Sequence, residues 1–383
     1  MTTMSDAMPN RYQAVFARGG TSKALIFHRR DLPEDTARWD AIFTSAMGAP
    51  DPYGRQLNGM GGGVSSLSKV CIVGPSSHPD ADVDYTFGQV GVQRATVDYN
   101  GNCGNMSSAI GPFAVDEGLV KASDGETTVR IFNTNTRKII HATFQVRNGK
   151  ARVDGDLAIP GVAGTGAPVR LDFLDPGGAS TGRLLPGGQP SQRLAIAGIG
   201  DVEVSLVDAA NACVFVDADT LGLAGTELPD QLEKHRDVMD RLMSIRCHAA
   251  VAMGLSGSAE EAGRKPLIPL IAFVSPPADA ATLTGERLPA SAMDLTVRMI
   301  SNGQPHRALP LTGSLCTAVA ASIEGTLVHR ATRAERGDVL RLGMPSGVIT
   351  VAAQVDREHG RWIARRGAFY RTTRRLFEGY VYA

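Results

Sequence analysis

Hydrophobic and polar residues alternate in many short runs along the chain, and this two-residue period is typical of strands with one buried face. Such runs lie at residues 83–97, 128–132, 138–146, 202–207, 213–216, 267–274, 339–342 and 348–355. The chain also contains 43 glycines and 21 prolines, which predict frequent turns between the runs. The pattern therefore predicts a strand-rich protein with few helices.

Helical patterns are of two kinds. Residues 228–253 carry charges on one face and apolar residues on another, which predicts one or two amphipathic helices, and residues 40–47 predict a short one. Residues 107–115 and 314–323 are instead rich in small residues and nearly uncharged. A helix that is apolar all round is normally buried on all sides, so these two are expected inside the protein.

The two buried helices have similar entries. Residues 102–105 read NCGN and residues 311–314 read LTGS, and such small polar residues beside a glycine are good helix starts. The repetition predicts two halves, each a strand-rich shell around one central helix. The loop at residues 175–190 is rich in glycine and proline and lacks periodicity, so it is the predicted boundary.

Composition and charge exclude several classes of protein. Lys+Arg and Asp+Glu number 39 each, without the basic excess of a typical nucleic-acid binder. The five cysteines have no CxxC spacing, which argues against disulfides and a zinc site. The first residues lack the apolar core of a signal peptide, and the strongest apolar run, residues 266–274, is too short to span a bilayer. We expect a cytoplasmic protein without a metal, nucleic-acid partner or membrane segment.

Cys103 is the best candidate for chemistry on physical grounds. It precedes a buried helix, where unpaired N–H groups and the helix dipole favour a thiolate. The same N–H groups can bind a carboxylate, and Gly104 would let the ligand approach closely. Polar Asn102 and Asn105 flank the thiol and favour this role over that of a buried structural cysteine, the usual fate of a free one.

Lys69 follows a loop that contains three glycines, residues 61–63, and several serines, including Ser66. Such a loop can wrap an anion with backbone donors. A lysine that enters an apolar strand would be desolvated, which lowers its pKa towards that of a base. The spacing alone slightly favours the alternative, a lysine that extends to the surface.

Two further segments could contact an anion. Residues 18–23 (RGGTSK) form a polar loop with Thr21 and Ser22, but the order of residues differs from a Walker A loop, so nucleotide binding is not expected. His306 precedes the second buried helix and could contact a carboxylate as a cation or donor, although a loop histidine is more often merely exposed.

Several motifs, taken in order, resemble the PrpF family over nearly the whole chain, from about Arg18 to Tyr382. They are RGGTSK, the glycine-rich loop that ends at Lys69, VDYTFGQV, NCGN followed by GPFA, HRALPLTG, LGMPSG and the terminal FEGYVY.

The resemblance implies an α+β fold similar to that of diaminopimelate epimerase. Two lobes, each a β-barrel-like shell around a central helix, would place the active site between the two helix N-termini. The C-terminal strand would return to the first lobe. The predicted lobes are therefore residues 1–185 with about 366–383, and residues 186–365.

The resemblance also implies isomerisation of unsaturated di- and tricarboxylates without a cofactor. The family's catalytic lysine and cysteine carry over to Lys69 and Cys103. We expect the carboxylates of the substrate to bind to the two helix starts and the neighbouring polar loops. The predicted binding residues are Thr21, Ser22, Ser66, Gly104, Asn105, His306, Thr312, Gly313 and Ser314.

Thr312 is a departure from the epimerases, in which the second helix also starts with a catalytic cysteine. A threonine hydroxyl is far too weak an acid to replace that thiol at neutral pH, which disfavours two-cysteine racemisation of an amino acid. Cys316 lies one turn further along and is expected in the core.

The favoured activity is 2-methylaconitate (aconitate-type) cis–trans isomerisation, because HRALPLTG and LGMPSG look more like that branch of the family. The alternatives are 4-oxalomesaconate tautomerase or Δ-isomerase, methylitaconate Δ-isomerase, an epimerase or racemase, and a non-catalytic accessory factor of a dehydratase. The expected partner is a small polycarboxylate, and a homodimer is assumed only because dimers are the commonest oligomers.

Overall fold

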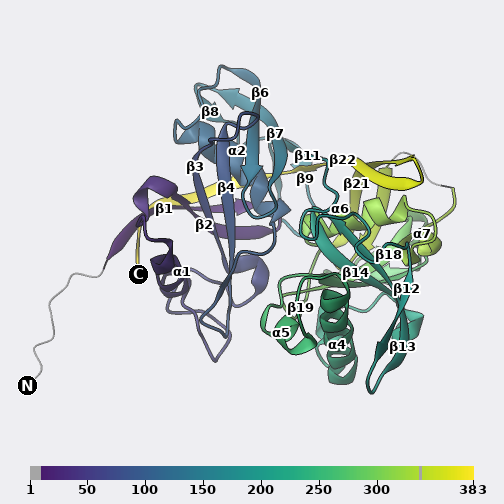
Figure 1. Ribbon diagram of the computed structural model, residues 1–383. Helices are drawn as coiled ribbons and strands as arrows, with labels where there is room; N and C mark the ends of the chain where they lie inside the picture. The colour runs from purple at the N-terminus through teal and green to yellow at the C-terminus, as the bar shows by residue number, and fades with distance from the viewer. Residues whose placement is uncertain (1–9, 336–338) are drawn as a thin grey trace, which may run out of the picture.

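Two helices that are buried along their length organise the structure (Figure 1). The computed structural model describes residues 10–335 and 339–383. Helix α2 spans Gly104–Asp116 and helix α6 spans Leu311–Ala321, as the two uncharged segments predict. Each helix is the centre of one lobe, and the strands around it close off its apolar surface.

The first lobe wraps strands around α2. Its strands are β1 (Arg11–Gly19), β2 (Ser22–His28), β3 (Lys69–Pro75), β4 (Val83–Val90), β5 (Val97–Asp98), β6 (Gly125–Asn133), β7 (Lys138–Arg147), β8 (Lys150–Ala151), β9 (Leu157–Ala158), β10 (Thr165–Gly166) and β11 (Val169–Leu174). Helix α1 (Trp39–Met47) packs against the outer face of this lobe and has its own small apolar cluster. The prediction of one continuous strand run at residues 83–97 is wrong in one respect. A turn, in which the Gly91 N–H donates to the Thr96 carbonyl, divides this segment into β4 and β5.

The second lobe repeats this plan around α6. Its strands are β12 (Gln192–Ile196), β13 (Gly200–Ala209), β14 (Asn211–Asp217), β15 (Leu270–Ser275), β16 (Ala280–Ala281), β17 (Arg287–Leu288), β18 (Leu295–Ser301), β19 (Gln304–Pro305), β20 (Val339–Met344) and β21 (Gly347–Glu358). The amphipathic region at 228–253 forms two helices, α3 (Pro229–Leu232) and α4 (Arg236–Ala252). Two short helices, α5 (Ala259–Arg264) and α7 (Leu327–Ala331), complete the lobe.

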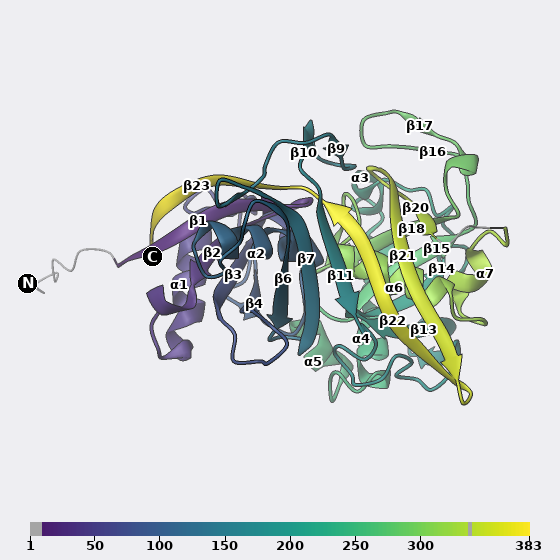
Figure 2. The ribbon, with the colours of Figure 1, turned by 90° about the horizontal axis from the view of Figure 1, so that it is seen from above.

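Strands β22 (Arg361–Arg371) and β23 (Thr373–Tyr382) join the lobes, and Figure 2 shows them crossing from one to the other. β22 pairs with β11 of the first lobe on one edge and with β21 on the other. β23 pairs with β1 along its length, from Arg11 opposite Tyr382 to Gly19 opposite Thr373. The C-terminal strand therefore lies on the first lobe, while the boundary near residue 185 stays a prediction.

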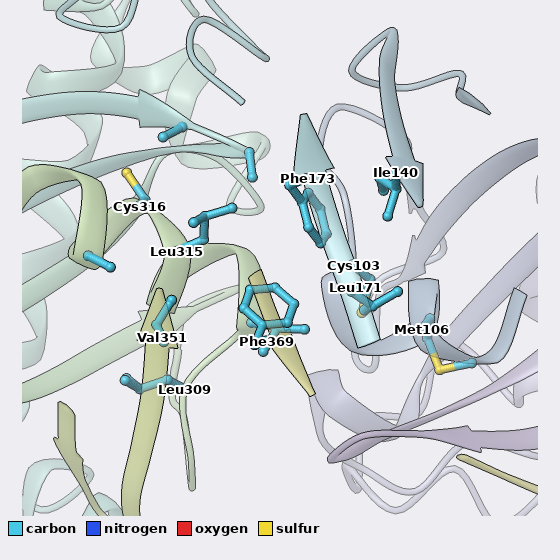
Figure 3. Packing of buried hydrophobic residues seen from close by; sticks show 14 of the residues in the cluster. Cys103, Met106, Ile140, Leu171, Phe173, Leu309, Leu315, Cys316, Val351 and Phe369 are labelled. Atoms are coloured by element: carbon cyan, nitrogen blue, oxygen red, sulfur yellow. The ribbon is translucent and has the colours of Figure 1, made fainter. Parts of the chain in front are cut away.

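The hydrophobic core also continues from one lobe to the other. Side chains around α2 and α6 belong to one contiguous cluster. Figure 3 shows Phe173 of β11 and Phe369 of β22 where the lobes meet, with ring centroids 5.4 Å apart. Within residues 10–335 and 339–383, the helices lack the combination of length and apolar character that a membrane crossing requires.

Candidate active site

A small cavity lies where the N-termini of α2 and α6 meet, at the junction of the lobes. Its volume, taken as the space that the centre of a water molecule can occupy, is about 30 Å³. Its lining is Ser22, Ser65, Lys69, Phe87, Gln89, Asn102, Cys103, Gly104, Asn105, Asn211, Leu267, Leu270, Ser301, His306, Pro310, Leu311 and Thr312. Both predicted catalytic residues face this space, and these lining residues include no carboxylate.

The two helix starts are in direct contact. A Cβ built on Gly104 would lie 3.1 Å from Leu311 Cβ and 3.2 Å from Thr312 Cγ2, so a glycine is what allows this close approach. The first intrahelical bonds are donated by the N–H groups of Ser107 and Ser314. The N–H groups that precede them in each helix have no partner within the helix, and they can bind anionic groups at the junction.

Cys103 is the N-cap residue of α2, as predicted. Its backbone is extended and its side chain makes no capping hydrogen bond. The carbonyl of Cys103 accepts hydrogen bonds from the Ser107 N–H (3.0 Å) and the Ser107 hydroxyl (3.1 Å), which fix the backbone. The residue is 9% exposed and its thiol faces the cavity, so it can take part in chemistry without being open to bulk solvent.

Lys69 begins β3 and is only 7% exposed, so the alternative of a surface lysine is wrong. Burial lowers the pKa of Lys69, and the nearby Cys103 and Cys71 thiols oppose this shift. The ammonium nitrogen lies 5.1 Å from the centroid of the Phe87 ring. A buried lysine with a lowered pKa, next to a thiol in one cavity, can serve as a general base or acid.

Gln89 holds the Lys69 side chain in place, and sequence reasoning missed it. The two residues pair across β3 and β4, and the Lys69 ammonium donates to Gln89 Oε1. Gln89 Nε2 donates to the carbonyls of Ser65 (3.0 Å) and Ser68 (2.8 Å), so the amide can present only its oxygen to Lys69. A polar residue two positions after buried Phe87, and so on the same face of the strand, was the available signal.

Asn211 bridges the two lobes beneath the cavity and was also missed. Its Oδ1 accepts from the Asn102 N–H (2.9 Å), and its Nδ2 donates to the Asn102 carbonyl and to Thr312 Oγ1, each at 3.0 Å. Asn133 Nδ2 donates to Asn102 Oδ1 (3.2 Å) and supports the same loop. The network connects residues about 100 positions apart, so no local pattern could have shown it.

Thr312 lines the cavity but differs in role from a second catalytic cysteine. Because its hydroxyl oxygen accepts from Asn211, the hydroxyl proton is available to donate towards the cavity. Cys316 is buried, and its thiol lies 3.3 Å from the Val207 carbonyl, which confirms its expected place in the core. Of the residues that line the cavity, Cys103 alone carries a thiol.

His306 lies beside Lys69 in the cavity wall, and of its two predicted roles, cation or donor, the surroundings favour the donor. Burial, followed by the charge of Lys69, lowers the pKa of His306 to about 4, so the ring is neutral at physiological pH. Its Nδ1 accepts from the Ala308 N–H (3.1 Å), which leaves the proton on Nε2. His306 can therefore act as a neutral hydrogen-bond donor.

Some predicted binding residues do not line the cavity. Ser314 is the clearest correction, because both its N–H (2.8 Å) and its hydroxyl (3.1 Å) donate to the Pro310 carbonyl. This happens because α6 begins at Leu311, the first residue of the predicted LTGS start, so Ser314 already lies in the first turn of the helix. Ser65 lines the cavity in place of Ser66, and the α-carbon of Gly313 faces Met299.

Thr21 is set back from the cavity by one residue. Its hydroxyl accepts from Asn105 Nδ2 (3.1 Å), while Ser22, Gly104 and Asn105 themselves form part of the lining. Across the described residues, no three His, Cys, Asp or Glu side chains gather in a way that would hold a metal ion.

Comparison with known proteins agrees with the resemblance in the motifs. Residues 10–383 match the family described as PrpF protein. The chain is 43% identical to 3-methylitaconate isomerase of Eubacterium barkeri over 99% of this chain and 98% of that protein. It is 37% identical to 2-methyl-aconitate isomerase of Cupriavidus necator over 96% of each.

Solved structures give the same picture of the fold. The crystal structure of methylitaconate-delta-isomerase has a TM-score of 0.79 and 42% identity, and covers 98% of this chain and 96% of that one. A hydroxyproline epimerase from Agrobacterium vitis has a TM-score of 0.57 at 15% identity, with 98% and 94% covered, and shows likeness of fold alone. The expected two-lobed, epimerase-like fold is confirmed, and the chain is an isomerase that belongs to the PrpF family.

Proposed function

We propose that the protein isomerises an unsaturated polycarboxylate by moving a proton between carbon atoms, with Lys69 and Cys103 as the proton-transfer pair. The observation that carries this proposal is that both side chains face one cavity between two helix N-termini. The N–H donors without helical partners at these termini favour carboxylates, and the absence of carboxylates from the described cavity lining avoids repulsion of such a substrate.

The chemistry needs one base, one acid and donors for the developing charge. The base breaks a C–H bond beside a double bond that is conjugated to a carboxylate, and the electron pair spreads into a dienolate. The acid then returns a proton to carbon, so the molecular formula is unchanged. Return to the far carbon shifts the double bond, whereas return to the original carbon after rotation exchanges cis and trans.

Two substrates are favoured by specific observations. The motifs HRALPLTG and LGMPSG favour 2-methylaconitate. The relative at 43% identity is named for 3-methylitaconate, and the one at 37% for 2-methylaconitate. Both reactions can begin with the same kind of step, removal of a proton from carbon beside a conjugated system, so one Lys69 and Cys103 pair would suit either substrate.

The test is turnover by the purified protein in deuterated water, followed by NMR with 3-methylitaconate, 2-methylaconitate and 4-oxalomesaconate. We expect Lys69→Ala and Cys103→Ala each to lower turnover at least about 100-fold, the usual contribution of a general acid or base. Lys121→Ala and Cys247→Ala are matched controls outside the cavity and should keep wild-type turnover.

Three outcomes would contradict the proposal. Full turnover in both active-site variants would remove Lys69 and Cys103 from the mechanism. Exchange of an amino acid's α-proton, with no reaction of the polycarboxylates, would favour a racemase, against which the Thr312 hydroxyl counts. Turnover that appears only with a partner dehydratase would favour an accessory role.

A further inference from the structure

Arg371, the last residue of β22, is a buried cation that has no carboxylate partner among the described residues. It is 5% exposed. Its Nε donates to Asn105 Oδ1 (3.1 Å) and its Nη1 to the Tyr370 carbonyl (3.0 Å). Burial alone lowers the pKa of Arg371 to about 9, with no nearby charge to offset it. The guanidinium is still charged at neutral pH.

The other two buried arginines of the described residues, Arg246 and Arg298, donate more hydrogen bonds than Arg371 does. Arg298 donates four hydrogen bonds to backbone carbonyls, and Arg246 donates three to carbonyls and one to the Cys247 sulfur. Arg371 has two described hydrogen-bond acceptors and lies over the Phe369 ring, with its Cζ 5.8 Å from the ring centroid, so it donates the fewest hydrogen bonds of these buried arginines.

Arg371 is connected to the cavity through Asn105. Because Asn105 Oδ1 accepts from Arg371, the Asn105 amide must present its Nδ2 to Thr21 Oγ1. The Thr21 hydroxyl, as an acceptor, is then left with a proton to donate. A Cβ on Gly20, whose φ is +52°, would lie 2.2 Å from Asn105 Oδ1 and 3.0 Å from Arg371 Cδ, so this turn packs directly on the pair.

The charges around the cavity make an anionic ligand with more than one carboxylate the best complement. The described wall supplies Lys69, two helix N-termini and no carboxylate. Arg371 adds a full positive charge immediately behind Asn105. One carboxylate can interact with Lys69 and the helix N-termini, and a second carboxylate can interact with the positive charge behind Asn105.

We propose that Arg371 is a positioning residue that, through Asn105, prepares Thr21 and the start of α2 for a substrate carboxylate remote from the reacting carbon, and so selects polycarboxylates over monocarboxylates. The inference rests on the proposed function. It assigns Arg371 to binding and selection, while Lys69 and Cys103 remain the groups that move protons.

The test compares Arg371→Gln and Arg371→Lys with wild-type protein. Substrates are whichever polycarboxylate is turned over and its monomethyl ester at the remote carboxylate. We expect Arg371→Gln to raise KM for the polycarboxylate about 10- to 100-fold, as for a lost charge-assisted interaction, with kcat changed much less. It should lose most of the preference over the monoester, and Arg371→Lys should recover part of it.

Arg374→Gln is the matched control, because it removes the same charge from an exposed neighbour. Unchanged KM and unchanged preference in folded Arg371→Gln would overturn the inference. A loss confined to kcat would also do so. If Arg371→Gln does not fold, Arg371→Lys is the deciding variant. Its preference for the polycarboxylate over the monoester must then be weaker than that of wild-type protein but not absent.

Calorimetry with tricarballylate, a saturated tricarboxylate, separates this inference from the proposed function. If wild-type protein turns over no polycarboxylate, the proposed function fails. The inference about Arg371 is then tested by binding alone. It holds if tricarballylate binds wild-type protein and Arg374→Gln more tightly than Arg371→Gln, and it fails if all three bind equally.

Discussion

Lys69 depends on a neighbour for the direction of its side chain. Gln89, itself 2% exposed, is locked by two backbone carbonyls so that its oxygen faces the ammonium group. A neutral acceptor orients the amine without adding a negative charge that would raise its pKa. The amide therefore orients Lys69 while leaving its pKa lowered by burial.

Gln89→Glu should shift the pH profile of activity upwards. A carboxylate at this position would raise the pKa of Lys69, whereas burial in the native protein lowers it. A base acts only when it is unprotonated, so activity would begin to rise at higher pH and fall at neutral pH. The pH dependence of kcat/KM measures this shift, and Gln145→Glu, an exposed change of the same charge, should leave it in place.

The candidate catalytic residues were predictable to different degrees. Cys103 could be proposed from the residues alone, because a thiol at the start of an uncharged helix is a local pattern. Lys69 needed the family resemblance, since a lysine at a strand start is usually exposed. Asn211 depends on contacts made across the folded chain with Asn102 and Thr312, which the sequence near it does not show.

At the scale of elements, the close contact of α2 and α6 sets the site. The sequence predicted both helices and their starts at NCGN and LTGS, but not that Pro310, rather than a small polar residue, is the N-cap of α6. Because α6 begins at Leu311, the Ser314 N–H is used within the helix. Strand runs were predictable from alternation, whereas their pairing across the lobes was not.

Gly104→Ala should separate the two helix starts. The added methyl group would be tighter against Leu311 and Thr312 than an ordinary contact, so we expect a loss of roughly 1–3 kcal/mol in stability, typical of overpacking. Turnover should fall as well. Denaturant unfolding and kcat/KM measure the two effects.

Gly263→Ala is the control for this change. Gly263 lies in helix α5, and a Cβ there would meet nothing within 4 Å. Alanine favours helix by about 1 kcal/mol over glycine, so this variant should be as stable as wild type or slightly more so. Equal behaviour of the two variants would show that the contact between α2 and α6 is not tight.

At the scale of the whole molecule, one sheet and one core run through both lobes. β22 carries hydrogen bonds to both lobes, and the apolar cluster is continuous across them. The sequence predicted two similar halves. It did not predict how strongly they are joined, because that depends on β11 and β22, which are far apart in the chain.

The lobes should therefore unfold together. The chain has two tryptophans, Trp39 in α1 of the first lobe and Trp362 in β22. Trp39→Phe and Trp362→Phe each leave one fluorescent reporter, and we expect the two variants to show the same denaturant midpoint, apart from the small effect of each substitution. Two separate midpoints by both fluorescence and circular dichroism would show independent lobes.

The small size of the cavity has a consequence for the speed of the enzyme. Pockets that hold small ligands measure roughly 300–1,000 Å³, and the space between α2 and α6 has about 30 Å³. A polycarboxylate needs more room than this, so we expect the helix starts to move apart as substrate enters and product leaves, a motion that works against the friction of the solvent. Where it is slower than chemistry, kcat will fall as sucrose thickens the medium, and a substrate deuterated at the reacting carbon will turn over as fast as the ordinary one.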